Sequence, residues 1–403
     1  MKTGAFARYW AAAAISSFGT AVTAVAMPVL VVQVLGASPL QVGLVSAAQF
    51  LPYGLLGPFA GVYVDRWRRT QTLIWASVGR ALSLGAIVVL WLTGVLQIWM
   101  LVLALLAFGS FSVFGFAATQ SLLPRLVRRE DLVTANARLD QTDAAAQTLG
   151  PTLGGGLVGL LGAPIAIAVD AVSYLIEAVL VAGVKVTDPR ASAPRRKLWT
   201  EIGEGLRFAY RHPTLTPLAV STHMWFLANG AALTVLSLLA LRTLGLSPFA
   251  FGLLFTAFGL ASLVGASLAP AVGRRLGSGR AVIFSRWAYP LAWLLVLVAP
   301  TTPIALPLLF TGLAVQGLAA GVENAHEMGF WQRETPDELL GRTNAFRRSA
   351  NRTLAAVGAL LAGVLAGAVG EAPVLAGVTV VFALAAVALS LSPLRHRSGA
   401  AAE

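Results

Sequence analysis

Residues 374–391 read VLAGVTVVFALAAVALSL, eighteen consecutive positions without a charged side chain. A membrane-spanning helix needs about 20 predominantly apolar residues to cross roughly 30 Å of hydrocarbon. The run is not isolated, because 57% of the 403 residues are apolar, 11% are charged and the mean hydropathy is +0.78. About a quarter of the residues in an ordinary soluble domain carry charge, so the composition excludes a soluble globule and predicts an integral membrane protein.

Similar apolar runs recur between charged residues and Gly or Pro breaks. A transmembrane barrel would instead show alternation within segments of about ten residues. The first run follows Lys2 and Arg8 like a signal peptide, but it continues to Leu35, which is too long for a signal core. We therefore predict an all-α integral membrane protein with twelve helices, at 9–35, 40–64, 70–94, 97–122, 133–161, 163–185, 214–241, 247–272, 279–299, 302–329, 340–369 and 372–394.

The distribution of basic residues predicts the topology. Of 29 Lys and Arg residues, 22 lie in the termini and alternate connections or at the helix ends beside them, six lie inside helices, and Arg242 alone lies in the other connections. Basic residues concentrate on the cytoplasmic side, so both termini are predicted to be cytoplasmic. The net charge of +12 is thereby explained without nucleic acid, and the absence of cysteine excludes thiolate metal sites and disulfides.

The two halves of the chain repeat. Ser38-Pro39 matches Ser247-Pro248 at an offset of 209, and Asn136-Ala137 matches Asn344-Ala345 at an offset of 208. The repeat predicts a six-helix bundle at 1–185, a cytoplasmic linker at 186–213 and a second six-helix bundle at 214–403. Apolar residues at helical spacing in the linker predict an amphipathic helix on the inner membrane surface; a plain tether is the alternative. Paired bundles of this kind alternate access around a midplane site in transporters.

Three motifs resemble the major facilitator superfamily, in the branch of macrolide-type drug exporters and the enterobactin exporter. Residues 61–69 read GVYVDRWRR, like the superfamily's loop between helices 2 and 3. Residues 123–130 read LPRLVRRE, and 150–155 read GPTLGG, an element similar to one in exporters that exchange substrate for protons. The resemblance implies a twelve-helix secondary transporter without a bound cofactor, driven by an ion gradient, with protons as the expected ion.

The resemblance also implies a cytoplasmic gate. In the family fold the end of helix 2 meets the start of helix 11, and by pseudo-symmetry the end of helix 8 meets helix 5. Opposite charges at these helix contacts would form a latch that closes when the transporter faces outward. Each exposed pair would contribute about 0–1 kcal/mol to the closed state. Positive-inside charges without a gating role are the alternative. The predicted gate residues are Asp65, Arg66, Arg69, Asp140, Arg274, Arg347 and Arg348.

Charged residues inside membrane helices are functional candidates, because each costs about 2.5–3.5 kcal/mol on insertion scales. The candidates for proton or cation coupling are Glu323, Asp143, Glu327 and His223. Alternatives are a structural pair of Glu327 with Arg286, a gating role for the acids of helix 5, and a core role for the histidine. Arg80 and Glu177, on supporting helices at similar depth, are predicted to form a buried ion pair.

Small and aromatic residues complete the predicted transport path. Close helix packing is predicted at Gly150, Pro151, Gly154 and Gly155. Aromatic side chains with a few polar groups suit a bulky amphipathic compound, although Phe in membrane helices also packs or faces lipid. The predicted cavity residues are Gln49, Tyr53, Phe111, Phe114, Gln147, Phe226, Asn229, Gln316 and Asn324.

No enzymatic motif is found. The three lysines stand in no phosphate-binding loop, no second His follows His326-Glu327 at metalloprotease spacing, and no G-x-S-x-G occurs. The prediction is therefore a monomeric multi-pass exporter of the cytoplasmic membrane, contacting membrane lipids and a small drug-like, macrolide-like or siderophore-like substrate. A lipid or lysolipid transporter and a nontransporting receptor or scaffold are the alternatives.

Overall fold

The computed structural model describes residues 3–184 and 198–396, and no strand occurs among them. Part of the predicted linker at 186–213 lies outside these residues. The first half of the chain forms α1 (Thr3–Val29), α2 (Pro39–Ala48), α3 (Leu51–Arg66), α4 (Arg69–Leu92), α5 (Ile98–Leu126), α6 (Leu132–Leu161) and α7 (Ala163–Ala182). The second half forms α9 (Leu215–Leu238), α10 (Pro248–Leu276), α11 (Ser278–Val298), α12 (Ala305–Glu334), α13 (Asp337–Val369) and α14 (Glu371–Ser390), with α8 (Leu198–Arg211) between the halves.

Eleven segments of the described chain are long and apolar enough to cross a membrane. They include α1 with the π-helical turn that follows it, α2 with the start of α3, and α9 with its own π-helical turn. The predicted helix at 133–161 is present as α6, which carries several polar and charged residues and is not among the eleven. The predicted all-α membrane fold is confirmed.

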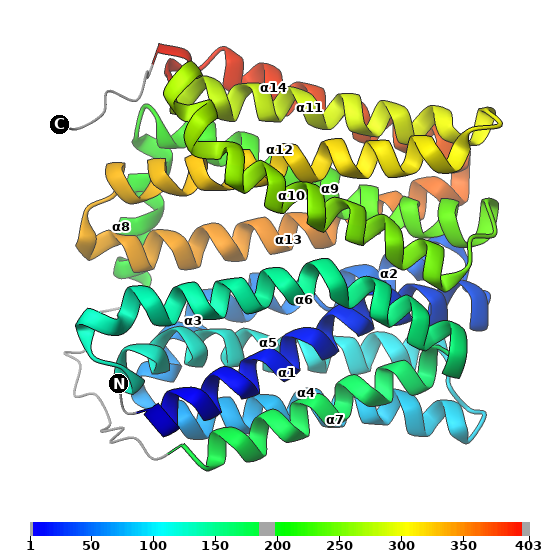
Figure 1. The fold of residues 1–403 in the computed structure, drawn as a ribbon, viewed down its shortest axis with the longest axis horizontal. Helices are drawn as coiled ribbons and strands as arrows, with labels where there is room; N and C mark the ends of the chain where they lie inside the picture. Colours follow the sequence, from blue (N-terminus) through cyan, green and yellow to red (C-terminus); the bar gives the residue numbers. More distant parts are fainter. Residues whose placement is uncertain (1–2, 185–197, 397–403) are drawn as a thin grey trace.

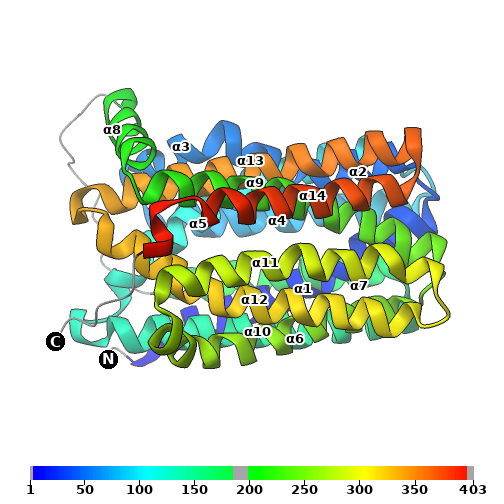
Figure 2. The ribbon, with the colours of Figure 1, turned by 90° about the horizontal axis from the view of Figure 1, so that it is seen from above.

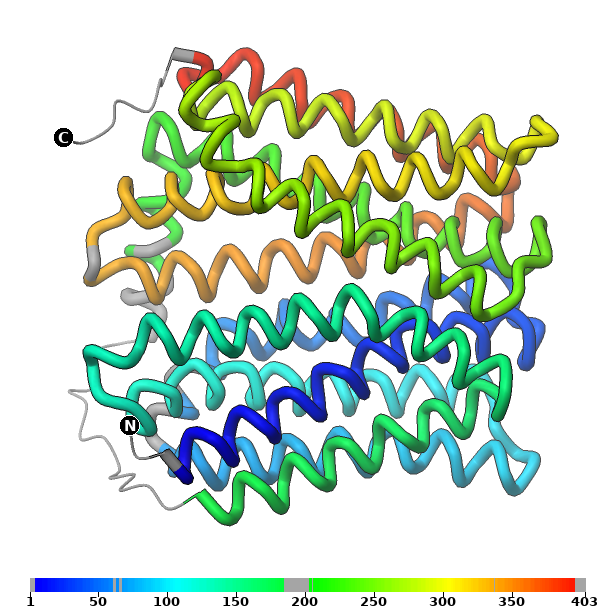
Figure 3. The backbone as a smooth tube through the Cα atoms, viewed as in Figure 1, coloured from blue at the N-terminus to red at the C-terminus, as the bar shows by residue number. Residues whose placement is uncertain are grey.

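The helices run lengthwise in two groups. Helices α1–α7 form one side of the bundle and α9–α14 the other, visible as the blue-to-green and green-to-red parts of the trace (Figures 1 and 3). The start of α1 and the end of α14 lie at the same end, which we call the terminal end; the opposite one is the far end. Helix α8 lies across the terminal end (Figures 1 and 2).

The halves touch through close helix pairs, α6 with α10 and α2–α3 with α13. Glycine permits this proximity. A Cβ on Gly155 of α6 would overlap the carbonyl of Pro248, and one on Gly252 of α10 would overlap the carbonyl of Pro151. Larger residues at these positions would therefore push the two halves apart at the far end.

A break divides the predicted helix at 40–64. Helix α2 ends at Ala48 and α3 begins at Leu51, with Pro52 in its first turn. Proline cannot donate a backbone hydrogen bond, so the ladder is interrupted before it. The carbonyl of Gln49, within this break, lies against Gly109 of α5, where a Cβ would overlap it. The break therefore brings α5 against the second membrane segment.

Candidate functional site

A cavity of about 1310 Å³ lies between the halves. Its lining comes from α3, α5 and α6 on one side and α9–α13 on the other. It runs from Trp225 and Tyr289, in the interior, to the exposed Glu338 in the first turn of α13 at the terminal end. The cavity therefore opens toward the terminal end.

A buried ion cluster forms one wall of the cavity. Nη2 of Arg286 lies 2.6 Å from Oε1 of Glu323 and 3.1 Å from Oε2 of Glu327. The same nitrogen donates to Oγ1 of Thr222 at 2.7 Å, and Thr222 donates to Glu327 at 3.0 Å. Arg286 is 1% exposed and Glu323 is 4% exposed. Charges this far from water persist only when they are paired. The cluster therefore gives this wall of the cavity a group of paired charges within an otherwise apolar bundle.

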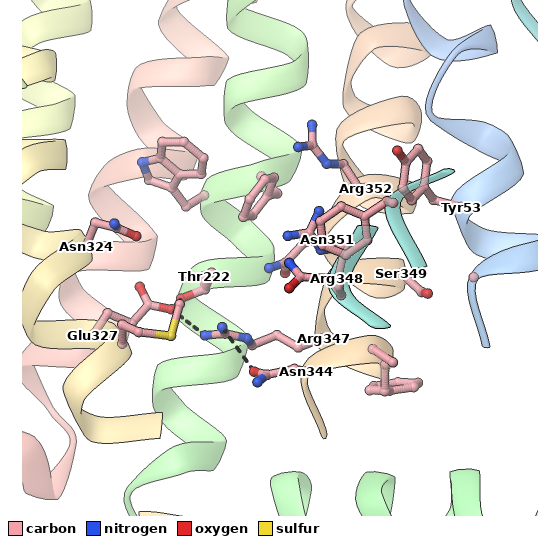
Figure 4. A pocket seen from close by; sticks show the side chains of 18 of the residues that line it. Tyr53, Thr222, Asn324, Glu327, Asn344, Arg347, Arg348, Ser349, Asn351 and Arg352 are labelled. Carbon is pink, nitrogen blue, oxygen red and sulfur yellow. Dashed lines mark hydrogen bonds and ion pairs between the residues drawn. The ribbon is translucent and has the colours of Figure 1, made fainter. Parts of the chain in front are cut away.

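Glu327 is shared between two arginines. Arg347 of α13 places Nη1 3.3 Å from Oε1 of Glu327 (Figure 4), whereas Arg286 meets the other oxygen, Oε2. Glu323 differs, because its Oε2 accepts no hydrogen bond within the described part of the chain, although Tyr289 lies beside it. The structural pair of Glu327 with Arg286 and the cavity position of Glu323, which were alternatives from sequence, thus coexist in one network.

Two further arginines of α13 face aromatic rings of the first half. The guanidinium carbon of Arg348 lies 3.4 Å from the ring centre of Phe116 in α5. That of Arg352 lies 5.2 Å from Phe50 and 6.0 Å from Tyr53. Figure 4 shows these arginines on the Tyr53 side of the cavity, apart from Glu327. Cation–π contacts of this kind cross from one half of the protein to the other.

The predicted cavity residues divide into two groups. Tyr53, Phe226 and Asn324 line the cavity. The other six do not: Gln49, Phe111, Phe114, Gln147, Asn229 and Gln316. The reasons are local. The ring of Phe111 packs on Gly79 of α4, that of Phe114 lies 6.0 Å from Trp67, and Gln316 donates to Asn229 at 3.2 Å. Phe116, rather than Phe111 or Phe114, is the aromatic residue of α5 that faces the cavity.

The predicted gate residues whose side chains the structure describes form no latch pair with one another in this open state. Among the described residues, Asp140 and Arg274 are exposed and form no ion pair, Arg347 pairs with Glu327, and Arg348 contacts Phe116. Arg69 is buried in the first turn of α4. The side chains of Asp65 and Arg66 lie outside the described residues. The latch thus remains a prediction for the opposite conformation.

The acidic residue and the small residues predicted to be functional in the helix at 133–161, which is α6, do not line the cavity. Asp143 is exposed, accepts from Ser17 of α1 at 3.3 Å and from Gln147 at 3.2 Å, and does not line the cavity. Gly150 and Gly154 pack against α1, where a Cβ on either would crowd Ala21 or Val22. Gly155 and Pro151 instead meet α10, so this stretch joins both halves.

His223 stands behind the cavity wall and links three helices. Its Nε2 is hydrogen-bonded to the hydroxyl of Tyr210 in α8, and its Nδ1 lies 2.6 Å from Oδ1 of Asn351 in α13. Burial raises the pKa of Tyr210 above its ordinary value, so the phenol stays protonated. Because Oδ1 of Asn351 can only accept, Nδ1 of His223 donates to it, and Nε2 accepts the hydrogen bond from the Tyr210 hydroxyl. Ala209 of α8, predicted to face the membrane surface, packs with Phe208 against the bundle, whereas Leu206, from the same predicted face, is exposed.

Arg80 and Glu177 lie together, with Nη2 of Arg80 2.9 Å from Oε2 of Glu177. Gly115 of α5, which is the repeat counterpart of Glu323, leaves room there, since a Cβ would lie 3.4 Å from the arginine. The first half thus pairs its arginine with α7, on the side away from the cavity. The second half pairs its arginine with α12, in the cavity wall.

The far end is closed by a symmetric pair of contacts that we call the far-end lock: Gln33 with Leu246, and Arg242 with Ala37. Nε2 of Gln33 donates to the carbonyl of Leu246 at 3.2 Å, and the Arg242 guanidinium donates to the carbonyl of Ala37. Both donors lie 209 residues apart, as do both acceptors. Arg242 is the one basic residue that departs from the predicted charge pattern, and the sequence alone predicts no role for it.

The repeated backbone presents these groups. Gln33 and Arg242 lie on π-helical turns, Leu30–Val34 and Leu239–Thr243. Each turn leads to a glycine at φ +60°, Gly36 or Gly245, a left-handed conformation that few other residues adopt. Ser38 and Ser247 then cap the next helices through their side chains. The repeat Leu-Gly-x-Ser-Pro at 35–39 and 244–248 is the sequence signal that could have revealed the lock.

Comparison with known proteins gives consistent matches along the chain. Residues 1–403 match the protein family described as transmembrane secretion effector. The multidrug efflux pump Tap of Mycolicibacterium fortuitum is 30% identical over 398 residues, which cover 96% of this chain and 95% of Tap. The enterobactin exporter EntS of Salmonella choleraesuis is 26% identical over 366 residues, covering 89% of this chain and 85% of EntS.

The fold is also found among solved structures. The nucleoside transporter NupG superposes with a TM-score of 0.77 at 14% identity, over 96% of this chain and 99% of NupG. At this level of identity the similarity concerns the fold alone.

Proposed function

This chain belongs to the transmembrane secretion effector family, within the major facilitator superfamily, and from that premise we propose that it exports a bulky organic compound by alternating access. The predicted superfamily and its exporter branch are confirmed, as is a multi-pass protein of the cell membrane. The names of Tap and EntS, an efflux pump and an exporter, support outward transport.

One observation carries the proposal: the cavity opens at the terminal end while the far-end lock holds the opposite end shut. If the terminal end faces the cytoplasm, as the basic residues predict, this is the state that loads a substrate from inside the cell. Transport then requires the halves to rock, breaking the lock and closing the terminal end. The volume of about 1310 Å³ supports a substrate of drug size or larger.

Glu323 is the proposed proton carrier. It lines the cavity and shares Arg286 with Glu327, so two carboxylates compete for one guanidinium. Exchange of substrate for protons requires Glu323 to take up its proton when the cavity is open at the far end and to release it when the cavity is open at the terminal end. In the terminal-open state described, Arg286 stabilises the ionised Glu323 that remains after this release. Protonation and the direction of opening are coupled in this scheme through the shared Arg286.

Transport into inverted vesicles tests the proposal. We expect compounds from a chemically mixed panel to accumulate inside the vesicles when the lumen is more acidic than the medium. Glu323→Gln should reduce this accumulation to the level measured without a gradient. Glutamine keeps the shape and one acceptor oxygen but does not exchange a proton at pH 7. Glu130→Gln, which removes an exposed carboxylate outside the cavity, is the matched control.

Three outcomes would count against parts of the proposal. Equal transport with and without the gradient contradicts proton coupling, and full gradient-driven transport by Glu323→Gln contradicts the role of this residue. Movement of lysophospholipid with none of the organic compounds would favour the lipid transporter instead.

A further inference from the structure

The cavity carries more positive than negative charge. Its lining contains five arginines and three glutamates, a net charge of +2, namely Arg286, Arg342, Arg347, Arg348, Arg352, Glu323, Glu327 and Glu338. Pairing accounts for most of them. Arg286 and Arg347 bind the two buried glutamates, and Arg342 lies 2.6 Å from Glu204 of α8. Glu338 is exposed at the mouth of the cavity.

Arg348 and Arg352 are the remaining charges. Within the described residues, neither makes an ion pair or donates a hydrogen bond; their contacts are the aromatic rings of Phe116, Phe50 and Tyr53. Both are only partly exposed. A guanidinium in a half-buried apolar setting gains most from an anion, because little water is left to stabilise it.

The geometry suits one ligand class. Residues four apart on a helix share a face, so Arg348 and Arg352 present their donors together. A guanidinium that rests on a ring by its face keeps its N–H edge free for a carboxylate or sulfonate. The rings around the pair would contact the apolar body of the same molecule, and Ser349 and Asn351 of α13 add uncharged polar groups to this wall.

We propose that Arg348 and Arg352 form an anion subsite, so that the exported compound is an amphipathic aromatic acid rather than a cation. This inference rests on the proposed export function and names the substrate class. The acidic group binds the arginine pair of the second half, and the aromatic body lies against Phe116 and Tyr53 of the first half. The substrate thereby bridges the two moving halves, away from the Glu323 and Glu327 network.

A matched pair of fluorescent probes tests the subsite. Anilinonaphthalene sulfonate and phenylnaphthylamine share an aromatic body, and only the first is an anion. We expect the full-length protein in nanodiscs, with empty nanodiscs subtracted, to bind the sulfonate at least about tenfold more tightly, since a charge-assisted contact has this size. The double variant Arg348→Gln with Arg352→Gln should weaken sulfonate binding by roughly 10- to 100-fold and change binding of the neutral probe less than about twofold.

The control removes the same charge elsewhere. Arg138→Gln with Arg275→Gln, two exposed positions outside the cavity, should leave the preference for the sulfonate unchanged. Equal binding of both probes by the parent protein, or an unchanged preference in the Arg348 and Arg352 variant, would overturn the proposal. A parallel loss of both probes in that variant would also overturn it, because the residues would then only maintain the shape of the cavity.

The vesicle assay separates this proposal from the proposed function. Gradient-driven transport without a preference for acids leaves export standing and removes the anion subsite. A sulfonate preference that depends on Arg348 and Arg352, in a protein that transports nothing, leaves the subsite standing and removes export.

Discussion

The Arg286→Met variant is expected to lose about 3–5 kcal/mol of its free energy of unfolding. Among the described residues, Arg286 is the one cationic partner of Glu323, and it also pairs with Glu327. Methionine fills a similar volume but leaves Glu323 as a buried carboxylate without a counter-charge. Denaturation of the purified protein in mixed micelles, followed by circular dichroism, measures the loss.

The partner variant makes this expectation specific. Adding Glu323→Gln to Arg286→Met should restore more than half of the lost stability, because the uncompensated charge is then gone. Arg80→Met is a matched comparison in the first half, where one glutamate at 2.9 Å loses its partner instead of two. If Arg286→Met and the double variant were equally unstable, Arg286 would stabilise the fold through packing of its long side chain and not through charge pairing.

The variant Arg242→Ala with Gln33→Ala is expected to move the conformational equilibrium toward a state open at the far end. The two side chains donate to carbonyls of the opposite half, and the cationic contact alone has a net value of about 1.5–3 kcal/mol. That energy corresponds to roughly a 10- to 150-fold shift in the ratio of the two states. Because the chain has no cysteine, a single cysteine introduced at Ala37, whose side chain is 2% exposed while the far end is closed, measures far-end opening by its rate of labelling without background.

Thr243→Val is the control for this experiment. It removes a hydrogen bond to Glu371 at 2.9 Å in the same region, but within the second half, so labelling at the far end should not change. Unchanged labelling in the Arg242 and Gln33 variant would show that helix packing, such as that at Gly155 and Gly252, holds the far end shut without the lock.

Much of the fold was accessible from sequence because membrane helices follow from local composition. The starts of α6, α7, α10 and α11 lie within one residue of their predicted positions. The break before Pro52 is not predicted, since it depends on the room that Gly109 of another helix leaves for the carbonyl of Gln49. The docking of α8 on the bundle likewise depends on tertiary partners that amphipathic spacing alone does not reveal.

The candidate site was partly accessible. Charge in an apolar helix identified Arg80, Glu177, Arg286, Glu323 and Glu327, because the cost of burying a charge requires a partner nearby. Rotation about a helix was harder to infer. Phe111, Phe114 and Phe116 are the same residue type in the same apolar helix, so the sequence does not distinguish them. Only the packing of α5 against α4 and α3 decides that Phe116 faces the cavity. The lock at Gln33 and Arg242 was missed because its acceptors are backbone carbonyls, which no side-chain pattern marks.

Rocking of the two halves is the central claim, and paired distances at both ends test it most directly. Spin labels on cysteines at Glu130 and Glu338 report the terminal end, and labels at Leu40 and Phe249 report the far end; the members of each pair are repeat counterparts in opposite halves. On moving the protein from the resting state to a proton gradient with transported compound, the terminal-end distance should shorten while the far-end distance lengthens. Distances that change in the same direction at both ends, or that stay fixed while transport proceeds, would contradict it.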